Sequence, residues 1–398
     1  MSNKLIHATD IRTLMKNNIR NYSMFIMLVL IIVIFAPLTN MNNLSPRNFT
    51  NIFFQYSYVL LLAVGMVQVI IVGGIDLSVG SVCAFVGAIS AMMYNTGMSM
   101  SLTLMGALVI GLLIGAFQGF WIAYVKIPAF IVTLSGMMLF RGLTYIVTKV
   151  NPVNLKDNGY ALFSTGIVDE ILGIKKIGLF YPLPILAAIF VLALFFLAEF
   201  SGRKRKIANG FDVAALPLFV AKLVFVSVLV LGLADRFARF RGLPVVVIVL
   251  GITIFVFHFI LKNAVLGRYI YAVGGNARSA KLSGINSEFV IFIVFCFMGM
   301  LAGIAAVIST GYMNSALPQA GNLFELDVIA ACYIGGVSAS GGIGTVIGVI
   351  VGGLVMSAIN NGMSLMNLGA QYQYVVKALI LLLAVSYDVY TRRKAGLG

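Results

Sequence analysis

Residues 53–95 read FFQYSYVLLLAVGMVQVIIVGGIDLSVGSVCAFVGAISAMMYN. Two apolar runs, 53–72 and 79–95, flank a glycine-rich break, Gly73-Gly-Ile-Asp-Leu-Ser-Val-Gly-Ser81. An apolar run of about 20 residues is long enough to cross the hydrocarbon core of a bilayer as a helix. Backbone can leave the helix at membrane depth only where protein or a water-filled cavity satisfies its polar groups. This stretch therefore predicts a membrane protein with an interrupted helix.

The whole chain has the composition of a protein that lies in lipid. Of its 398 residues, 61% are hydrophobic and 10% are charged, whereas a soluble domain carries roughly 25% charged residues. The 27 basic and 12 acidic residues leave a net charge of +15. In a membrane protein this excess is typical of cytoplasmic loops, which collect Lys and Arg during insertion. We therefore expect the protein to lie in the lipid bilayer, and we expect no nucleic acid as a partner of its basic residues.

Apolar runs of near-spanning length recur along the chain. A shorter run, 326–337, is about long enough for a half-span or a re-entrant element. Counting it predicts an all-α polytopic membrane protein with about twelve crossings, some of them broken or re-entrant, in one domain covering 1–398. The longer runs cover 24–39, 53–72, 79–95, 101–125, 128–148, 179–199, 215–233, 243–261, 289–310, 343–360 and 372–390.

The basic residues predict that both chain ends are cytoplasmic. An even number of crossings places both ends on one side, and the inner segments then carry twice as many Lys and Arg residues as the outer ones. This is the bias of the positive-inside rule. The polar segment 1–22 becomes a cytoplasmic tail, and the run 24–39 becomes an uncleaved helix, because no small-x-small cleavage site follows it. The segment Asp235–Arg241 opposes the rule, because its three arginines would lie outside.

Three basic residues, Arg141, Lys222 and Lys377, fall within the predicted spans. Ionisable side chains at membrane depth are costly, so they pair, line a cavity or extend to the interface. We interpret Arg141 as extending to the outer headgroup layer, with a buried pair to an acid as the alternative, and Lys222 as extending to the inner one.

Glycines at four-residue spacing predict close packing between helices. Small residues at this spacing let two backbones approach each other in lipid, and the pattern says nothing about a substrate. The three sets are Gly111, Gly115 and Gly119, then Gly299 and Gly303, and then Gly344, Gly348 and Gly352.

A second break, Gly335-Gly-Val-Ser-Ala-Ser-Gly-Gly-Ile-Gly344, is similar to the first. Paired broken helices, one in each half of a chain, indicate a translocation pathway. Two roles are open to Asp76, which can cap a helix or line the pathway. The pathway candidates are Gly73, Gly74, Asp76, Ser78, Gly80, Asp327, Ser338, Asn360 and Asn361.

The longest polar inner loop covers 262–288. After Gly274-Gly275-Asn276, residues 277–282 can form one or two helical turns, and Gly284 has the position of a C′ glycine. A short helix bounded by glycines suits docking to a soluble partner. A linker that is basic through topology alone is an equally open interpretation.

Four stretches of this sequence occur in the order typical of one transporter family. They are Gly74-Ile-Asp-Leu-Ser-Val-Gly80, then Gly267-Arg-Tyr-Ile-Tyr-Ala-Val-Gly-Gly-Asn276 continuing to Leu282-Ser-Gly-Ile285, then Glu325-Leu-Asp-Val-Ile-Ala-Ala331, and Asn360-Asn-Gly362. Together they closely resemble the monosaccharide-type ABC importer permeases, the ribose, xylose, arabinose, galactose and multiple-sugar group. The resemblance covers about 50–200 and 262–390.

This resemblance implies a multi-pass permease of the bacterial inner membrane that is a transport subunit and not an enzyme, so no cofactor is expected. Two copies of the permease would form the channel, a periplasmic sugar-binding protein would deliver a monosaccharide, and a cytoplasmic ABC ATPase would drive the cycle. The resemblance also implies that the segment 74–80 borders the pathway. The residues implied to couple to the ATPase are Gly267, Arg268, Gly274, Gly275, Asn276, Ala280, Lys281, Leu282, Gly284 and Ile285.

The segment 200–262 departs from the shorter members of that family. It is an insert with two extra apolar runs, 215–233 and 243–261. The longer xylose and multiple-monosaccharide permeases look similar in this respect, which favours a pentose or a galactose-like hexose as the substrate.

Several chemistries find no support in the sequence. The chain has no Gly-Lys dipeptide and hence no Walker A phosphate loop, so ATP hydrolysis requires another chain. Its two histidines, His7 and His258, do not form a metal motif. The alternatives are an intramembrane serine protease that uses Ser338 and His258, an ion-coupled secondary transporter, and a permease of the same family for a nucleoside, a signalling molecule or a branched-chain amino acid.

Overall fold

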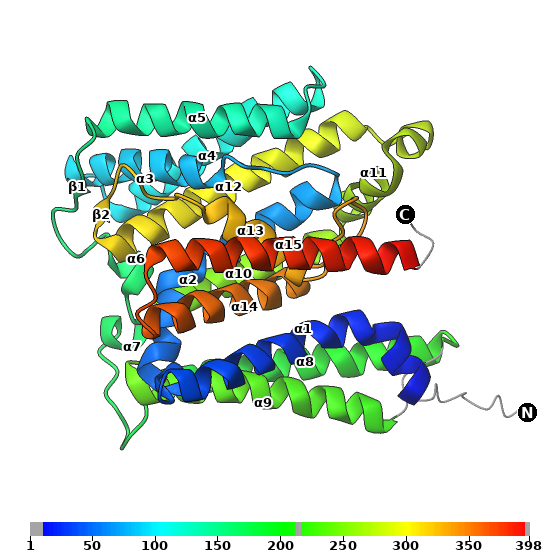
Figure 1. Cartoon of the computed structure of the whole chain (residues 1–398). Helices are drawn as coiled ribbons and strands as arrows, with labels where there is room; N and C mark the ends of the chain where they lie inside the picture. The colour runs from blue at the N-terminus through cyan, green and yellow to red at the C-terminus, as the bar shows by residue number, and fades with distance from the viewer. Residues whose placement is uncertain (1–10, 212, 214–215, 395–398) are drawn as a thin grey trace, which may run out of the picture. The chain divides into compact units, whose positions relative to one another are not determined.

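The computed structural model describes residues 11–211, 213 and 216–394, most of which are helical (Figure 1). Among them, 8 helices are long and apolar enough to cross a membrane, and shorter apolar helices cover Met24–Leu38, Val79–Asn95 and Ala370–Ser386. The prediction of an all-α polytopic membrane protein is confirmed. The count of twelve crossings stays a prediction, and the first part of the predicted tail, residues 1–10, lies outside the described residues.

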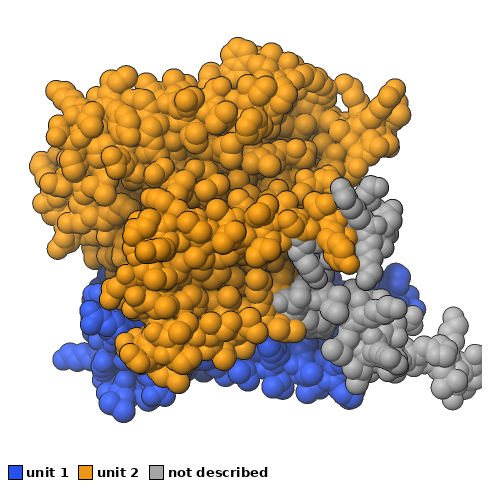
Figure 2. Space-filling view, in the orientation of Figure 1, with its two compact units in different colours: residues 1–23, 45–50, 167–244 blue, residues 24–44, 51–166, 245–398 orange. Residues whose placement is uncertain are grey.

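The chain forms two compact units, which Figure 2 distinguishes by colour. Unit 1 comprises residues 1–23, 45–50 and 167–244, and unit 2 comprises residues 24–44, 51–166 and 245–398. The single domain covering 1–398 and the insert at 200–262 stay predictions.

Unit 1 is built on a pair of long helices. Helices α8 (Pro182–Ala208) and α9 (Leu216–Phe240) pack against each other, and the short α7 (Val168–Ile171) precedes them. Lys222 Nζ on α9 lies 2.6 Å from Glu199 Oε1 on α8. This lysine, which we interpreted as extending to the headgroups, is thus paired with an acid.

Acidic partners accompany two of the three arginines that oppose the positive-inside rule. Arg239 Nε lies 2.8 Å from Asp235 Oδ1, one helical turn earlier. Arg241 contacts Glu170 through two parallel hydrogen bonds, of 2.8 Å from Nε and 2.6 Å from Nη2. A bidentate pair of this kind requires both segments to lie on the same side of the membrane.

Unit 2 contains the remaining elements and the most buried helices of the described chain. These helices are α2 (Pro46–Ile71) from Asn51 onward, α12 (Ser287–Met313) and α14 (Val346–Leu365), whose apolar residues are mostly shielded by neighbours. The other elements are η1 (Asn42–Leu44), α3 (Val79–Asn95), α4 (Met100–Ala123), α5 (Ala129–Thr148), β1 (Val153–Asn154), α6 (Leu162–Thr165), α10 (Val245–Asn263), α11 (Val265–Leu282), β2 (Ser315–Ala316), α13 (Phe324–Ile334), α15 (Ala370–Lys394) and the part of α1 (Ile11–Leu38) from Met24 onward.

Glycines bring α4 and α12 into backbone contact, as their spacing predicts. A Cβ atom at Gly111 would collide with the carbonyl oxygen of Gly299, and one at Gly115 would collide with that of Phe295. On α12, a Cβ atom at Gly303 would lie 2.5 Å from the carbonyl oxygen of Ala107. In lipid the hydrophobic effect contributes little to helix association, so van der Waals packing between closely approaching backbones stabilises the α4–α12 pair instead. The packing interpretation of these glycines is confirmed.

Contacts between distant segments gather the loops of unit 2 at two ends (Figure 1). At one end β1 and β2 pair antiparallel, and Asn95 Nδ2 donates to the Asn154 carbonyl at 2.8 Å. There Tyr94 donates a 2.6 Å hydrogen bond to Asp157, which lowers the pKa of that exposed loop carboxyl. At the other end the connection after α4 meets α11 and the start of α12. The loops predicted to lie on the same side of the membrane are thus found at the same end of unit 2. Which end faces the cytoplasm stays a prediction.

We predict that Gly299→Val destabilises the protein by about 1–3 kcal/mol, because the added methyl groups overpack the α4–α12 contact. The matched control is Gly251→Val on α10, where a Cβ atom would meet no atom within 4 Å. The free energy of unfolding, measured by SDS titration in mixed micelles, should fall for the first variant and stay near the parent value for the second. Equal losses in both would contradict the packing argument.

Candidate functional site

Both predicted breaks begin with the same helix-ending turn. Gly73 has φ +85° after α2, and the N–H of Gly74 donates to the Val69 carbonyl at 2.8 Å. Gly336 has φ +81° after α13, and the N–H of Val337 donates to the Cys332 carbonyl at 3.0 Å. Glycine adopts this left-handed conformation without steric cost. The first glycine pair of each break therefore closes a helix with a Schellman turn.

Three segments that are distant in sequence meet at the end of α2. The N–H of Gly342 donates to the Ile71 carbonyl at 2.9 Å. A Cβ atom at Gly274 on α11 would collide with that same carbonyl oxygen, and one at Gly341 would lie 3.0 Å from the Gly274 carbonyl oxygen. We name this contact of Ile71, Gly274 and Gly341–Gly342 the glycine junction. It places the predicted coupling loop directly against both breaks.

A tyrosine adds a second link between α11 and the second break. Tyr271 Oη donates to the Gly344 carbonyl at 2.7 Å, one residue before Thr345 caps α14. A displacement of α11 would therefore act on the backbone before α14 as well as on the end of α2.

The segment after the glycine junction forms the predicted short helix. Asn276 is extended, and its Oδ1 accepts from the N–H of Ser279 at 2.9 Å, so it caps a new helical segment that ends at Leu282. Gly284 has φ +83°, and the N–H of Ile285 donates to the Ala280 carbonyl at 3.1 Å. The prediction of a helix over 277–282 with Gly284 at C′ is confirmed. Its Ala280 is buried, whereas Leu282 is 85% exposed.

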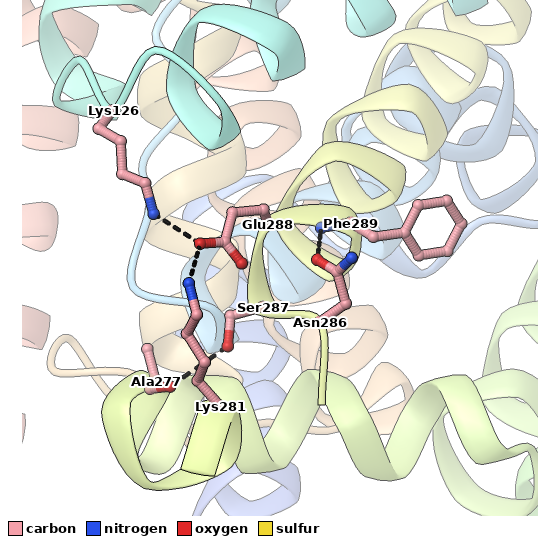
Figure 3. Close-up of polar contacts among 7 residues, drawn as sticks. All are labelled: Lys126, Ala277, Lys281, Asn286, Ser287, Glu288 and Phe289. Atoms are coloured by element: carbon pink, nitrogen blue, oxygen red, sulfur yellow. Dashed lines mark hydrogen bonds and ion pairs between the residues drawn. The ribbon is translucent and has the colours of Figure 1, made fainter. Parts of the chain in front are cut away.

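Figure 3 shows how this short helix is attached to the bundle. Glu288 Oε1, in the first turn of α12, lies 2.7 Å from Lys126 Nζ and 2.8 Å from Lys281 Nζ. Ser287 Oγ donates to the Ala277 carbonyl at 3.2 Å. One carboxylate thus joins the short helix to α12 and to the connection between α4 and α5.

The first turns of α3 and α13 meet in unit 2. Asp76 Oδ1 accepts from the N–H of Ser78 at 2.8 Å and from its hydroxyl at 2.7 Å. Gln118 Nε2 on α4 donates to Ser78 Oγ at 2.8 Å. A Cβ atom at Gly80 would collide with the Gly321 carbonyl oxygen, just before α13. Asp76 therefore forms a turn with Ser78, the N-cap residue of α3, and both its capping role and its pathway role stay predictions.

A buried ion pair joins α13 to α15. Lys377 Nζ lies 2.8 Å from Asp327 Oδ2, with 15% of the lysine side chain and 2% of the aspartate side chain exposed. Asn360 Nδ2 on α14 donates to the same oxygen at 3.3 Å. Three helices thus share one carboxylate in the apolar interior, where an unpaired charge would be costly.

The amino-acid sequence matches the family described as "Branched-chain amino acid transport system / permease component" over residues 48–385. The chain belongs to this permease family. It is therefore a multi-pass transport subunit and not an enzyme.

Curated relatives of the permease match it over almost its whole length. The xylose transport system permease protein XylH of Escherichia coli strain K12 is 38% identical over 386 residues, which are 94% of each chain. XylH of Haemophilus influenzae is 36% identical over 95% of the permease and 98% of the relative. The ribose import permease protein RbsC of Haemophilus influenzae is 33% identical over 96% of the permease and 99% of the relative. No solved structure matches the chain.

The predicted pathway residues of the permease fall into separate places. Gly73 and Gly74 end α2, Asp76, Ser78 and Gly80 start α3, and Asp327 and Asn360 share the ion pair with Lys377. Ser338 is fully buried in the second break, where its N–H donates to the Ile343 carbonyl at 3.0 Å, and Asn361 is 4% exposed. Their role in lining a pathway stays a prediction.

The predicted coupling residues form one continuous segment with different exposures. Gly267 packs against the end of α10, and Gly274 is in the glycine junction. By contrast, Arg268, Gly275 and Asn276 are exposed. Docking to an ATPase stays a prediction for all of them.

Sequence reasoning missed the roles of two intramembrane basic residues. The interpretation of Arg141 as extending to the headgroups stays a prediction, and the structure adds that Arg141 Nη1 donates to the carbonyls of Ala320 at 2.6 Å and Pro318 at 3.1 Å. Lys377 carried no assigned role, although it pairs with Asp327. Charged residues within apolar runs were the available signal, since such residues seldom lack a structural or functional reason.

We predict that Lys377→Met lowers the free energy of unfolding of the permease by about 3–5 kcal/mol, because it leaves a buried carboxylate unpaired. The double variant Asp327→Asn/Lys377→Met should recover most of that loss. Lys262→Met, at an exposed position, is the control and should change little. SDS titration provides the measurement, and a double variant as unstable as the single one would contradict the pairing.

Proposed function

We propose that this permease is the membrane subunit of an ABC importer for a monosaccharide, with D-xylose as the first candidate. Two copies form the channel in a bacterial inner membrane, a periplasmic sugar-binding protein delivers the solute, and a separate cytoplasmic ABC ATPase supplies the energy. The similarity to xylose and ribose permeases supports this substrate class. The insert at 200–262 favours xylose over ribose, because the longer xylose permeases look similar in this segment whereas shorter members of the family lack it.

The glycine junction is the observation that carries the mechanism. Its contacts are made between backbones, with no flexible side chain between Gly274 and the Ile71 carbonyl. Close-packed contacts transmit displacement, because protein interiors have low compressibility. When the ATPase closes on ATP, movement of the short helix after Gly275 reaches both breaks together. The bundle then changes between outward-open and inward-open states.

The short helix also has a surface suited to a partner. Leu282 is 85% exposed, and the lysines at 126 and 281 each keep 64% of their side chains exposed although both contact Glu288. An isolated apolar side chain with a basic rim matches the composition of protein interfaces with a small anchor. The docking surface comprises Arg268, Gly275, Asn276, Lys281, Leu282, Gly284 and Ile285.

The same contacts support the proposed sidedness. The connection after α4 and the segment that contains the short helix meet at one end of unit 2. Both carry the basic residues expected on the cytoplasmic side. With this end facing the cytoplasm, both chain termini are cytoplasmic, and the count is twelve crossings including the half-spans.

The neutral solute needs a path lined by hydroxyls and amides with little charge. Ser78, Ser338, Asn360 and Asn361 supply such groups, and Gly73, Gly74, Asp76, Gly80 and Asp327 shape the helices that hold them. Movement of the two breaks would bring these groups to the path during the transport cycle.

The test is reconstitution of the permease with its ATPase and binding protein in proteoliposomes. ATP-dependent uptake of D-xylose supports the proposal. Uptake by the permease alone, without ATP, would instead establish a secondary transporter.

Leu282→Asp should abolish co-purification of the ATPase and reduce ATP-driven uptake by at least about tenfold, because a charge replaces the apolar anchor of the interface. Leu172→Asp changes a residue that is 64% exposed after α7, outside the docking surface, and it should retain the ATPase. Mass spectrometry of the purified complexes provides the measurement. Retention of the ATPase by Leu282→Asp would show that the docking surface lies elsewhere.

Gly274→Ala should reduce uptake by about tenfold or more while the ATPase remains bound, because its new methyl group separates α11 from Ile71. The matched variant Gly251→Ala on α10 should keep uptake near the parent rate, since Gly251 lies outside the docking surface and a Cβ atom there meets no atom within 4 Å. Uptake and ATP hydrolysis are measured in the same vesicles. Equal effects of the two substitutions would contradict transmission through the glycine junction.

A further inference from the structure

A polar pocket opens where α3 and α13 begin. Its volume is about 440 Å³, and its lining includes Ser81, Met138, Arg141, Gln319, Asn322 and Glu325. It lies in unit 2 and contains none of the nine residues that the sequence indicated for the pathway. This volume falls within the range of about 300–1,000 Å³ that is usual for small-molecule sites.

The polar groups of the pocket are held in place by the fold. Ser81 is 2% exposed and Glu325 is 9% exposed, yet both line the pocket. Among the described residues, no side chain donates a hydrogen bond to either of them. The two carbonyl contacts of Arg141 fix its guanidinium group beside the segment that carries Gln319 and Asn322. The pocket thus presents preorganised polar atoms to whatever occupies it.

The position of Arg141 indicates water or protein, rather than lipid, in front of the pocket. Arg141 lies seven residues before Thr148, the last residue of α5, or about 10 Å along the helix at 1.5 Å per residue. Charged groups at such depth face protein or a water-filled cavity, because hydrocarbon solvates them poorly. The open side of this pocket therefore belongs to a hydrated path or to an interface between chains.

The chemistry of the lining selects a neutral, polyhydroxylated solute. Arg141 and Glu325 contribute one charge of each sign, so a charged solute gains no net attraction from them. A carboxylate accepts hydrogen bonds from neighbouring hydroxyl groups, and the amides of Gln319 and Asn322 both donate and accept. The thioether of Met138 offers a soft apolar surface for a C–H face.

We propose that this pocket is a monosaccharide-binding subsite of the permease, in which Glu325, Arg141 and the two amides bind the sugar hydroxyls. The proposal rests on the proposed function and adds to it a site outside the two helix breaks. The solute would dock at the convergent first turns of α3 and α13 between release by the binding protein and entry into the cytoplasm.

The first test fills the pocket without changing a buried residue. Met138 is 72% exposed on α5, and Met138→Trp should lower ATP-driven D-xylose uptake by about tenfold or more with the complex still assembled. Met105 is 62% exposed on α4 outside the pocket, so Met105→Trp serves as the matched control and should stay near the parent rate. Full uptake by an assembled Met138→Trp complex would overturn the subsite.

A second measurement does not depend on transport. The three native cysteines are buried, so Met138→Cys provides one accessible thiol in purified permease. D-Xylose should slow its reaction with a methanethiosulfonate reagent, and the anionic analogue D-xylonate should not. A labelling rate that D-xylose leaves unchanged would overturn the subsite. If the parent complex shows no xylose uptake, the proposed function fails, and this labelling assay still decides whether the pocket binds the sugar.

Discussion

The hydrogen bond from the Gly342 N–H to the Ile71 carbonyl is the contact on which the arrangement of the breaks depends. A helix that ends at membrane depth leaves carbonyl groups that lipid cannot satisfy. Here the N–H of Gly342, in the second break, donates to the Ile71 carbonyl at the end of α2. Gly274 packs against the same carbonyl oxygen. The requirement to satisfy one buried carbonyl therefore brings two breaks and the loop before α12 into a single cluster.

The same requirement explains how the helix ends beside the breaks are stabilised. Schellman turns close α2 and α13, and Asp76 with Ser78 organises the start of α3. Glycine contacts then hold α4 against α12, where hydrophobic association contributes little in lipid. The polar groups that remain at depth, such as Asp327 with Lys377, are paired inside the protein. The result is a bundle whose interruptions are ordered parts of its structure.

Function then follows from where the interruptions lie relative to the loops. The short helix that ends at Leu282 is exposed on one side and joined to the bundle by Glu288 on the other. Gly274 connects it to both breaks, and the starts of α3 and α13 lie beside a polar pocket. An importer needs these three features, namely a surface for the energy source, a mechanical link and a site for the solute.

Much of this protein follows from local sequence patterns. The apolar runs correspond to long helices, the glycine spacing corresponds to backbone contacts, and the short helix forms where Asn276 and Gly284 bound it. These features are predictable because hydropathy, small-residue spacing and capping act within one or a few helical turns. The sequence left two roles open for Asp76, and the structure adds its two hydrogen bonds with Ser78 at the start of α3.

The sequence by itself determined the class of protein, the two glycine-rich breaks and the boundaries of the short helix at 277–282. Only the tertiary structure decided that Lys377 pairs with Asp327, that Arg141 contacts carbonyls near α13 and that Gly274 rather than Gly275 touches α2. Each of these contacts joins residues that are tens to hundreds of positions apart. No local pattern encodes such contacts, because they arise only when helices that are distant in sequence pack together in lipid.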